Sequence, residues 1–172
     1  MKQLITIFLI TIVTFHVSAQ KKYASKNIVV KGRITQTSDY CGGAQPTEEL
    51  LNELRSKQPV EGKIIYIRQV STSKMANPII KKVVTDASGN FKVVLKSGYT
   101  YHFVEEWKHD PLKIPTDTEF VTWDENCFKT RYNTPDYILK VKTKGNPVVA
   151  INYHTPCFYR PYCGNYTGPL PP

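Results

Sequence analysis

The residues best able to do chemistry in this chain are its four cysteines. They are Cys41, Cys127, Cys157 and Cys163. An even number of cysteines in an exported chain predicts disulfides, and four cysteines allow three ways of pairing. We expect Cys157 to pair with Cys163, because the two lie close together in sequence, and Cys41 to pair with Cys127.

The alternative use of the same thiols is a metal site. His154, Cys157 and Cys163 lie near one another in sequence, and thiolate and imidazole ligands suit zinc or copper. Their spacing lacks the Cys-x-x-Cys knuckle that is typical of zinc sites. We therefore expect disulfides, with no metal and no other cofactor, and keep a periplasmic zinc- or copper-binding protein as the alternative hypothesis.

Histidines and carboxylates offer few candidates for catalysis. His102 alternates with aromatic residues in an expected strand, whereas His109 and Asp110 lie in a stretch that contains further carboxylates. A hydrolase could use a carboxylate pair, and another enzyme would need a pocket that brings His109 or His154 to a carboxylate. The spacing of these histidines and carboxylates in the sequence does not show that any of them meet in the folded protein. We interpret the stretch as a solvated acidic loop and predict that the protein is not an enzyme.

The first residues predict a signal peptide over 1–19. Lys2 precedes an apolar run that ends in Val17-Ser18-Ala19, which has the small residues of a signal-peptidase site. The run is shorter than the about 20 residues of a membrane helix, and no later segment approaches that length. We therefore expect a mature chain from Gln20 that is periplasmic or secreted, has no membrane span and, lacking a cysteine at the cleavage point, carries no lipid anchor.

The chain is basic, with 23 Lys and Arg against 14 Asp and Glu and a net charge of +9. Loss of Lys2 with the signal peptide would leave +8. Many lysines take alternate strand positions, as Lys92 and Lys96 do, which is typical of a solvated face. Such a face could also bind an anionic partner, such as a polysaccharide or a membrane surface. Aromatic and basic residues do not interleave as in platforms for single strands, so no nucleic-acid partner is expected.

Alternating hydrophobicity predicts the strands, most clearly within residues 82–103. Phe91, Val93 and Leu95 alternate with outward positions, so one face of this strand should be buried. Turn residues at 86–90 and 97–98 predict that it forms a three-stranded meander with its neighbours in sequence. Gly32 indicates a bulge or a close backbone approach in the first strand. The seven expected strands cover residues 27–35, 63–69, 79–85, 91–95, 99–104, 137–141 and 147–153.

Several motifs resemble the carboxypeptidase regulatory-like domain family. They are Gly32-Arg33-Ile34, the run at 62–67, Thr85-Asp86-Ala87-Ser88-Gly89-Asn90-Phe91 and Leu95-Lys96-Ser97-Gly98-Tyr99, within residues 28–105. The resemblance implies a mainly β fold, a single transthyretin-like (Ig-like, prealbumin-like) sandwich of about seven strands. It also implies a non-catalytic role in binding or spacing, because the family's domains are usually appendages of other proteins.

Two further resemblances concern function. The transthyretin-like fold includes an enzyme, hydroxyisourate hydrolase, whose chain ends in Tyr-Arg-Gly-Ser. This chain has Tyr159-Arg160-Pro161 instead and continues to Pro172, so that activity is not implied. The turn at 41–44 and the Gly-Pro-x-Pro-Pro ending are similar to small exported proteins of Bacteroidota-type bacteria, which implies a Gram-negative periplasm and no activity.

The expected β-sandwich domain covers residues 20–153 and includes a helix and a long connection, and a separate tail follows it. A short helix is predicted at 47–57, a long connection without clear periodicity at 106–136, and a rigid, strandless tail rich in proline, cysteine and aromatic residues at 154–172, clipped by a disulfide and packed on the domain. We predict that the connection and the tail bind a cell-envelope protein or glycan. The predicted contacts are four exposed aromatic residues, Trp107, Trp123, Tyr159 and Tyr162.

Overall fold

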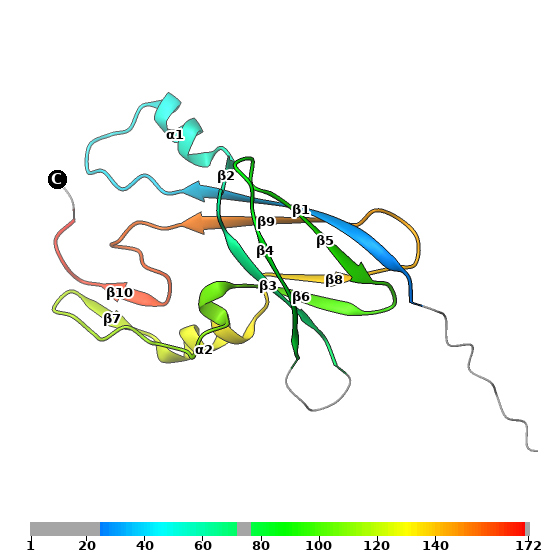
Figure 1. Ribbon diagram of the computed structural model, residues 1–172. Helices are drawn as coiled ribbons and strands as arrows, with labels where there is room; N and C mark the ends of the chain where they lie inside the picture. Colours follow the sequence, from blue (N-terminus) through cyan, green and yellow to red (C-terminus); the bar gives the residue numbers. More distant parts are fainter. Residues whose placement is uncertain (1–24, 72–76, 171–172) are drawn as a thin grey trace, which may run out of the picture.

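Two four-stranded sheets pack face to face in the computed structural model, which describes residues 25–71 and 77–170 (Figure 1). Sheet A contains β1 (Asn27–Ser38), β2 (Gln58–Pro59), β5 (Asn90–Lys96) and β9 (Val148–Thr155). Sheet B has the order β4 (Ile79–Val84), β3 (Ile64–Gln69), β6 (Thr100–Glu105), β8 (Tyr137–Lys140). The predicted mainly β sandwich is confirmed. The signal peptide expected at 1–19 lies outside the described residues.

Strand β1 is the central strand of sheet A. On one side its residues 31–38 run parallel to β9. On the other side its residues 27–33 pair antiparallel with β5, and Thr35 and Gln36 pair with β2. Because β1 and β9 are parallel, the segments that follow them leave the sheet at the same end of the molecule (Figure 1).

The core lies between the sheets and follows the period of two that the sequence shows. In β5 the residues Phe91, Val93 and Leu95 are buried, as predicted, and the residues between them are exposed. In β6 the side chains of Tyr101 and Phe103 are almost wholly buried. The same core contains aliphatic residues from five other strands or their ends, namely Val30, Ile34, Ile65, Ile67, Val83, Leu139, Val141, Val149 and Ile151.

The predicted meander is wrong. β4 and β6 both pair with β3 in sheet B, whereas β5 pairs with β1 in sheet A. Each connection of β5 therefore crosses from one sheet to the other instead of closing a hairpin. Alternation identifies a strand with one buried face, but it is the same for a strand in either sheet, so it cannot assign the partner.

The turn between β4 and β5 is fixed by its own residues and by β1. The Asp86 carboxylate accepts hydrogen bonds from the backbone N–H groups of Ser88 and Asn90, at 2.9 and 2.8 Å. Gly89 has φ of 73°, a left-handed conformation that glycine adopts without strain, and its carbonyl oxygen accepts from the N–H of Ile34 at 2.8 Å. The turn thus docks on β1 and directs β5 into sheet A.

The long connection and the tail contain more structure than predicted. The connection has a 3₁₀ turn η1 (Glu106–Lys108), strand β7 (Val121–Trp123) and helix α2 (Glu125–Asn133). The tail, expected to be strandless, contains β10 (Gly164–Tyr166), which pairs antiparallel with β7. These strands are three residues long, too short for a periodicity signal to identify them.

Both helices begin at a capping side chain. Helix α1 (Glu48–Arg55) matches the predicted helix, and the Thr47 hydroxyl accepts from the N–H of Leu50. Asp124 caps α2 by accepting from the N–H of Cys127. Within the described residues, neither helix has the length and apolar character needed to cross a membrane.

Gly32 allows a close contact inside sheet A. The pairing of β1 with β5 passes through it without the bulge that was one expectation, and the group that approaches its backbone is a side chain. A Cβ atom at this position would lie 2.0 Å from the ring of Phe91, the residue opposite it in β5. The ring therefore lies over the glycine and fills the space that a side chain would occupy.

We expect Gly32→Ala to destabilise the fold by about 1–3 kcal/mol, because the ring of Phe91 must move out of its core position. The same substitution should cost less in a Phe91→Leu background, where the ring is gone. Urea unfolding of the two single variants and the double variant measures this coupling. An equal cost of Gly32→Ala in both backgrounds would contradict the contact.

Candidate binding surface

The tail is fastened to the sandwich by two disulfides. Cys41, which follows β1, pairs with Cys157, which follows β9, and Cys127 in α2 pairs with Cys163 just before β10. The predicted pairing of Cys157 with Cys163 and of Cys41 with Cys127 is therefore wrong.

The cause lies in the sheets. Parallel β1 and β9 bring Cys41 and Cys157 to the same end, with their Cα atoms 5.3 Å apart, and the pairing of β10 with β7 brings Cys163 to α2. Closeness in sequence along the tail did not predict these contacts, because the tail runs from the end of β9 towards β7.

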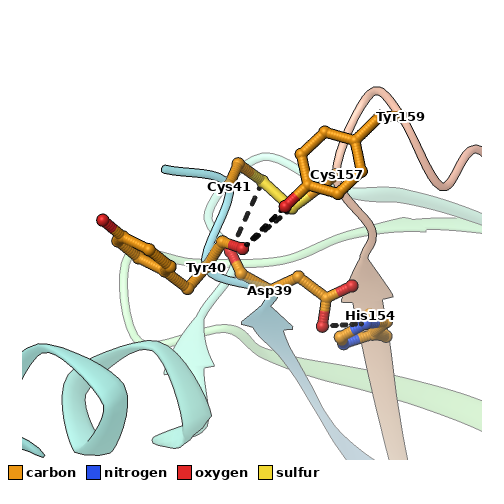
Figure 2. The surroundings of a disulfide bond; sticks show 6 residues. All are labelled: Asp39, Tyr40, Cys41, His154, Cys157 and Tyr159. Atoms are coloured by element: carbon orange, nitrogen blue, oxygen red, sulfur yellow. Dashed lines mark hydrogen bonds and ion pairs between the residues drawn. A yellow bond between two sulfur atoms is a disulfide. The ribbon is translucent and has the colours of Figure 1, made fainter. Parts of the chain in front are cut away.

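The predicted alternative metal site is not formed by its three residues. Cys157 and Cys163 belong to different disulfides, so neither offers a thiolate. In the part of the chain that the structure describes, no three His, Cys, Asp or Glu side chains are grouped as metal ligands. His154 instead lies against Asp39, with its Nε2 atom 3.1 Å from Oδ1 of the carboxylate (Figure 2).

One group of side chains has the composition of the catalytic triads that hydrolases use to activate a nucleophile. It contains a carboxylate, an imidazole and a hydroxyl, from Asp39, His154 and Thr37. The Nδ1 atom of His154 lies 3.3 Å from Oγ1 of Thr37. That hydroxyl also lies 3.4 Å from the carbonyl oxygen of Tyr153 and from the side-chain amide of Asn152. The imidazole and the carboxylate are partly exposed, and Asn152 and Tyr153 of β9 also contact the Thr37 hydroxyl. We interpret the group as polar contacts that join the ends of β1 and β9.

Trp107 and Tyr162 lie on either side of one arginine. The guanidinium of Arg131, in α2, is 4.1 Å from the ring centroid of Tyr162 and 5.7 Å from that of Trp107. The indole N–H of Trp107 donates to Glu105 at 2.8 Å, and Glu105 also forms an ion pair with Lys63. Trp107 is half-buried, and Arg131, which contacts its ring, also joins the long connection to Tyr162 of the tail.

A buried ion pair holds the start of the long connection. The ammonium of Lys108 donates to Oδ1 of Asp136 at 2.5 Å and to the carbonyl oxygen of Thr134 at 2.9 Å. The other oxygen of Asp136 accepts from the backbone N–H of Glu105 at 2.7 Å. Burial raises the pKa of Asp136, while Lys108 acts in the opposite direction. Both side chains are almost fully buried, so each depends on the other for its charge to be balanced.

Four aromatic residues cluster where the tail meets β7, and we call them the aromatic end. The ring of Phe158 lies edge-on to Tyr159 and Tyr166, with centroids 5.2 and 5.6 Å apart, and Phe120 is 6.5 Å from Tyr166. Phe158 is 59% exposed and Phe120 is 41% exposed. Leu170, which is 71% exposed, extends this apolar surface.

An open hollow of about 530 Å³ lies beside the aromatic end. It is lined by the Gly42-Gly43 turn on one side and by tail residues that include Tyr159, Arg160 and Leu170 on the other. The hydroxyl of Tyr159 donates to the carbonyl oxygen of Tyr40 at 3.4 Å, beside the Cys41–Cys157 disulfide (Figure 2). The wall of the hollow is thereby tied to the disulfide.

Trp123 is half-buried in the two-stranded sheet formed by β7 and β10, which we call the small sheet. A Cβ at Gly164 would come within 2.8 Å of its ring, and Phe128 of α2 packs edge-on against it at 5.6 Å. Its indole N–H is buried without a hydrogen-bond partner among the described residues. Trp123 therefore supports the pairing of β7 with β10.

The four predicted contact residues thus occupy three places. Trp107 and Tyr162 flank Arg131, Tyr159 lines the hollow, and Trp123 lies inside the small sheet. Only Tyr162 is exposed. Sequence reasoning missed three members of the aromatic end, namely Phe120, Phe158 and Tyr166. The density of aromatic residues in the tail was the available signal for the last two, whereas Phe120 joins them only through the pairing of β7 with β10.

We expect Lys108→Met to destabilise the fold by about 3–5 kcal/mol, because it leaves the Asp136 carboxylate buried without its cation. Asp136→Asn in the same chain should recover part of that loss, since an amide needs no counter-ion. Urea unfolding of both single variants and the double variant gives the coupling free energy. A double variant whose loss equals the sum of the single losses would show that the pair does not interact.

Non-reducing peptide mapping should recover a peptide that joins Cys41 to Cys157 and a second that joins Cys127 to Cys163. In the loop-entropy treatment the first bridge, with a sequence separation of 116, stabilises by about 5 kcal/mol and the second, with a separation of 36, by about 4 kcal/mol. Urea unfolding of the two double Cys→Ala variants tests this order. A recovered peptide linking Cys157 to Cys163 would contradict the structure.

No protein-family model matches the chain, and the comparison with curated proteins gives no match. Among solved structures, the chain is similar to the shaft pilin SpaA from Lactobacillus rhamnosus GG. One crystal structure of a mutant of that pilin aligns with a TM-score of 0.41 and 12% identity, over 76% of this chain and 52% of the pilin chain. Another crystal structure of the pilin aligns with a TM-score of 0.36 and 13% identity, over the same shares. The chain therefore spans about half the length of the pilin chains that it matches.

Proposed function

We propose that the protein is a non-enzymatic binding or accessory module of the periplasm or the cell exterior. Its contact surface is the aromatic end with the adjoining hollow, and its partner is a protein or glycan of the cell envelope. The observation that carries the proposal is the clustering of exposed Phe120 and Phe158 with Tyr159 and Tyr166 beside an open hollow.

Exposed aromatic residues in contact with one another are uncommon on the surface of a monomer without a partner, and such patches mark interaction sites. Aromatic side chains also give large contact area for little loss of conformational freedom on binding, which is why they dominate the energetics of interfaces. Phe158, the most exposed of the four, is therefore the expected anchor.

Two disulfides and a strand pair hold the segments that form the surface. The Cys41–Cys157 disulfide holds one wall of the hollow, the Cys127–Cys163 disulfide holds the start of β10, and β7 pairs with β10 beneath the rings. A surface already held in its binding conformation loses less entropy on association. Arg160 and the Gly42-Gly43 backbone supply polar groups beside the rings, a combination suited to a peptide segment or to the faces of sugar rings.

The disulfides support the proposed compartment, since structural disulfides persist in oxidising surroundings such as the periplasm or the cell exterior. The resemblance to carboxypeptidase regulatory-like domains supports the proposed accessory role, because those domains usually serve larger systems without catalysing a reaction.

Photo-crosslinking in the producing cells tests the proposal. A benzophenone amino acid in place of Phe158 should give an adduct with an envelope component, and the adduct should weaken when Tyr159→Ala is added. An anchor in such an interface typically contributes about 2 kcal/mol, equivalent to about thirtyfold in affinity. Mass spectrometry of the adduct identifies the partner as protein or glycan.

The matched control carries the same crosslinker at Ile138, which is also exposed, at 58%, but lies in β8 at the edge of sheet B. It should give no such adduct. Equal adducts at the two positions, or none at position 158, would reject the aromatic end as the contact surface.

A further inference from the structure

The outer face of sheet A carries four exposed cations on two neighbouring strands. In β1 the alternation that buries Val30 and Ile34 turns Lys31 and Arg33 outwards. In β5 the same alternation exposes Lys92 and Lys96. These four residues, which we call the basic face, come from strands that pair directly.

Two of these cations face each other across the sheet. Lys31 pairs directly with Lys92 in the antiparallel register, an arrangement in which like charges destabilise the sheet. None of the ion pairs among the described residues involves a member of the basic face. Asp86 lies beside Lys31 and Lys92 at the edge of the face, but its carboxylate already accepts from two N–H groups of its own turn.

Asparagines occupy the strand positions next to the cations. Asn27 is the direct cross-strand partner of Lys96, and Asn90 is the partner of Arg33. Both asparagines are exposed. The face therefore combines groups that bind carboxylates or phosphates with amides that can donate to and accept from hydroxyl groups. The exposed pair Val29 and Val94 lies between them.

We propose that the basic face binds an acidic polysaccharide. Lys31 and Lys92 are about 5 Å apart across the strands, and Lys31 and Arg33 are about 7 Å apart along β1. Lys96 lies about 14 Å along β5 from Lys92, so the four cations present an extended array of charge that a chain of acidic sugars can follow. The asparagines bind the sugar hydroxyls. This site is separate from the aromatic end and stands whether or not that surface binds a partner.

Other polyanions fit the face less well. The exposed valines on and beside this face are Val29 in β1, Val94 in β5 and Val148 in the neighbouring β9. They are shorter than the lysines and cannot reach into a bilayer as the aromatic or long aliphatic anchors of membrane-binding surfaces do. No aromatic residue occupies an outward position of β1 or β5 within the basic face, so nucleic-acid bases would find no stacking platform.

Binding to polygalacturonate, a polymer of carboxylated sugars, tests the proposal on the whole mature protein. We expect binding at about 50 mM salt that weakens strongly by about 200 mM, as expected when cations neutralise a polyanion, and no binding to neutral dextran. Lys31→Gln with Lys92→Gln should weaken it by about tenfold or more. The same variant should unfold at a higher temperature, because the facing charges are gone.

The matched control is Lys57→Gln with Lys113→Gln, which removes the same charge from exposed positions outside the face. It should bind like the unmodified protein, as should Phe158→Ala, which alters only the aromatic end. Equal losses in both lysine variants would show that net charge alone governs binding and would overturn the site. Absence of binding at low salt, or tighter binding to phosphatidylglycerol vesicles or single-stranded DNA, would overturn the polysaccharide as its ligand.

Discussion

The parallel pairing of β1 with β9 is the constraint on which the rest of the structure depends. It joins the first long strand to the last over residues 31–38 and 148–155 and places β9 at one edge of sheet A. Because parallel strands end on the same side, Cys41 and Cys157 meet there, and the tail starts its course beside the segment that follows β1. The hollow and the aromatic end exist because two segments far apart in sequence leave the sheet together (Figure 1).

A second constraint on the structure is the buried ion pair that joins the start and the end of the long connection. Lys108 and Asp136 join the two ends of that connection to each other and to the end of β6. Arg131, which lies between them in sequence, contacts both Trp107 and Tyr162. A buried ion pair contributes little net stability compared with apolar packing, but it tolerates only one arrangement of its partners. It is suited to positioning α2, which has no buried residues of its own.

The two proposed surfaces differ in chemistry and in what supports them. The aromatic end is built from irregular segments held by disulfides. Its apolar rings suit a partner whose surface is complementary in shape and in direct contact with them. The basic face is part of a regular sheet, and its unpaired charges act over longer distances that salt screens. A module with both could be held on an acidic polymer of the envelope while it contacts a second component.

The sequence by itself determined the class of fold, the helix after Thr47 and the seven strands longer than three residues, because hydrophobic periodicity is a local property of the chain. It also identified the exposed lysines of β5 and the close approach at Gly32. It did not show helix α2 or the short strands β2, β7 and β10. Tertiary structure alone decided that β5 joins β1, that Cys157 pairs with Cys41, and that Phe120 meets Tyr166. These contacts join distant segments, and alternation is the same whichever sheet a strand enters. Partner choice therefore depends on packing the whole core at once.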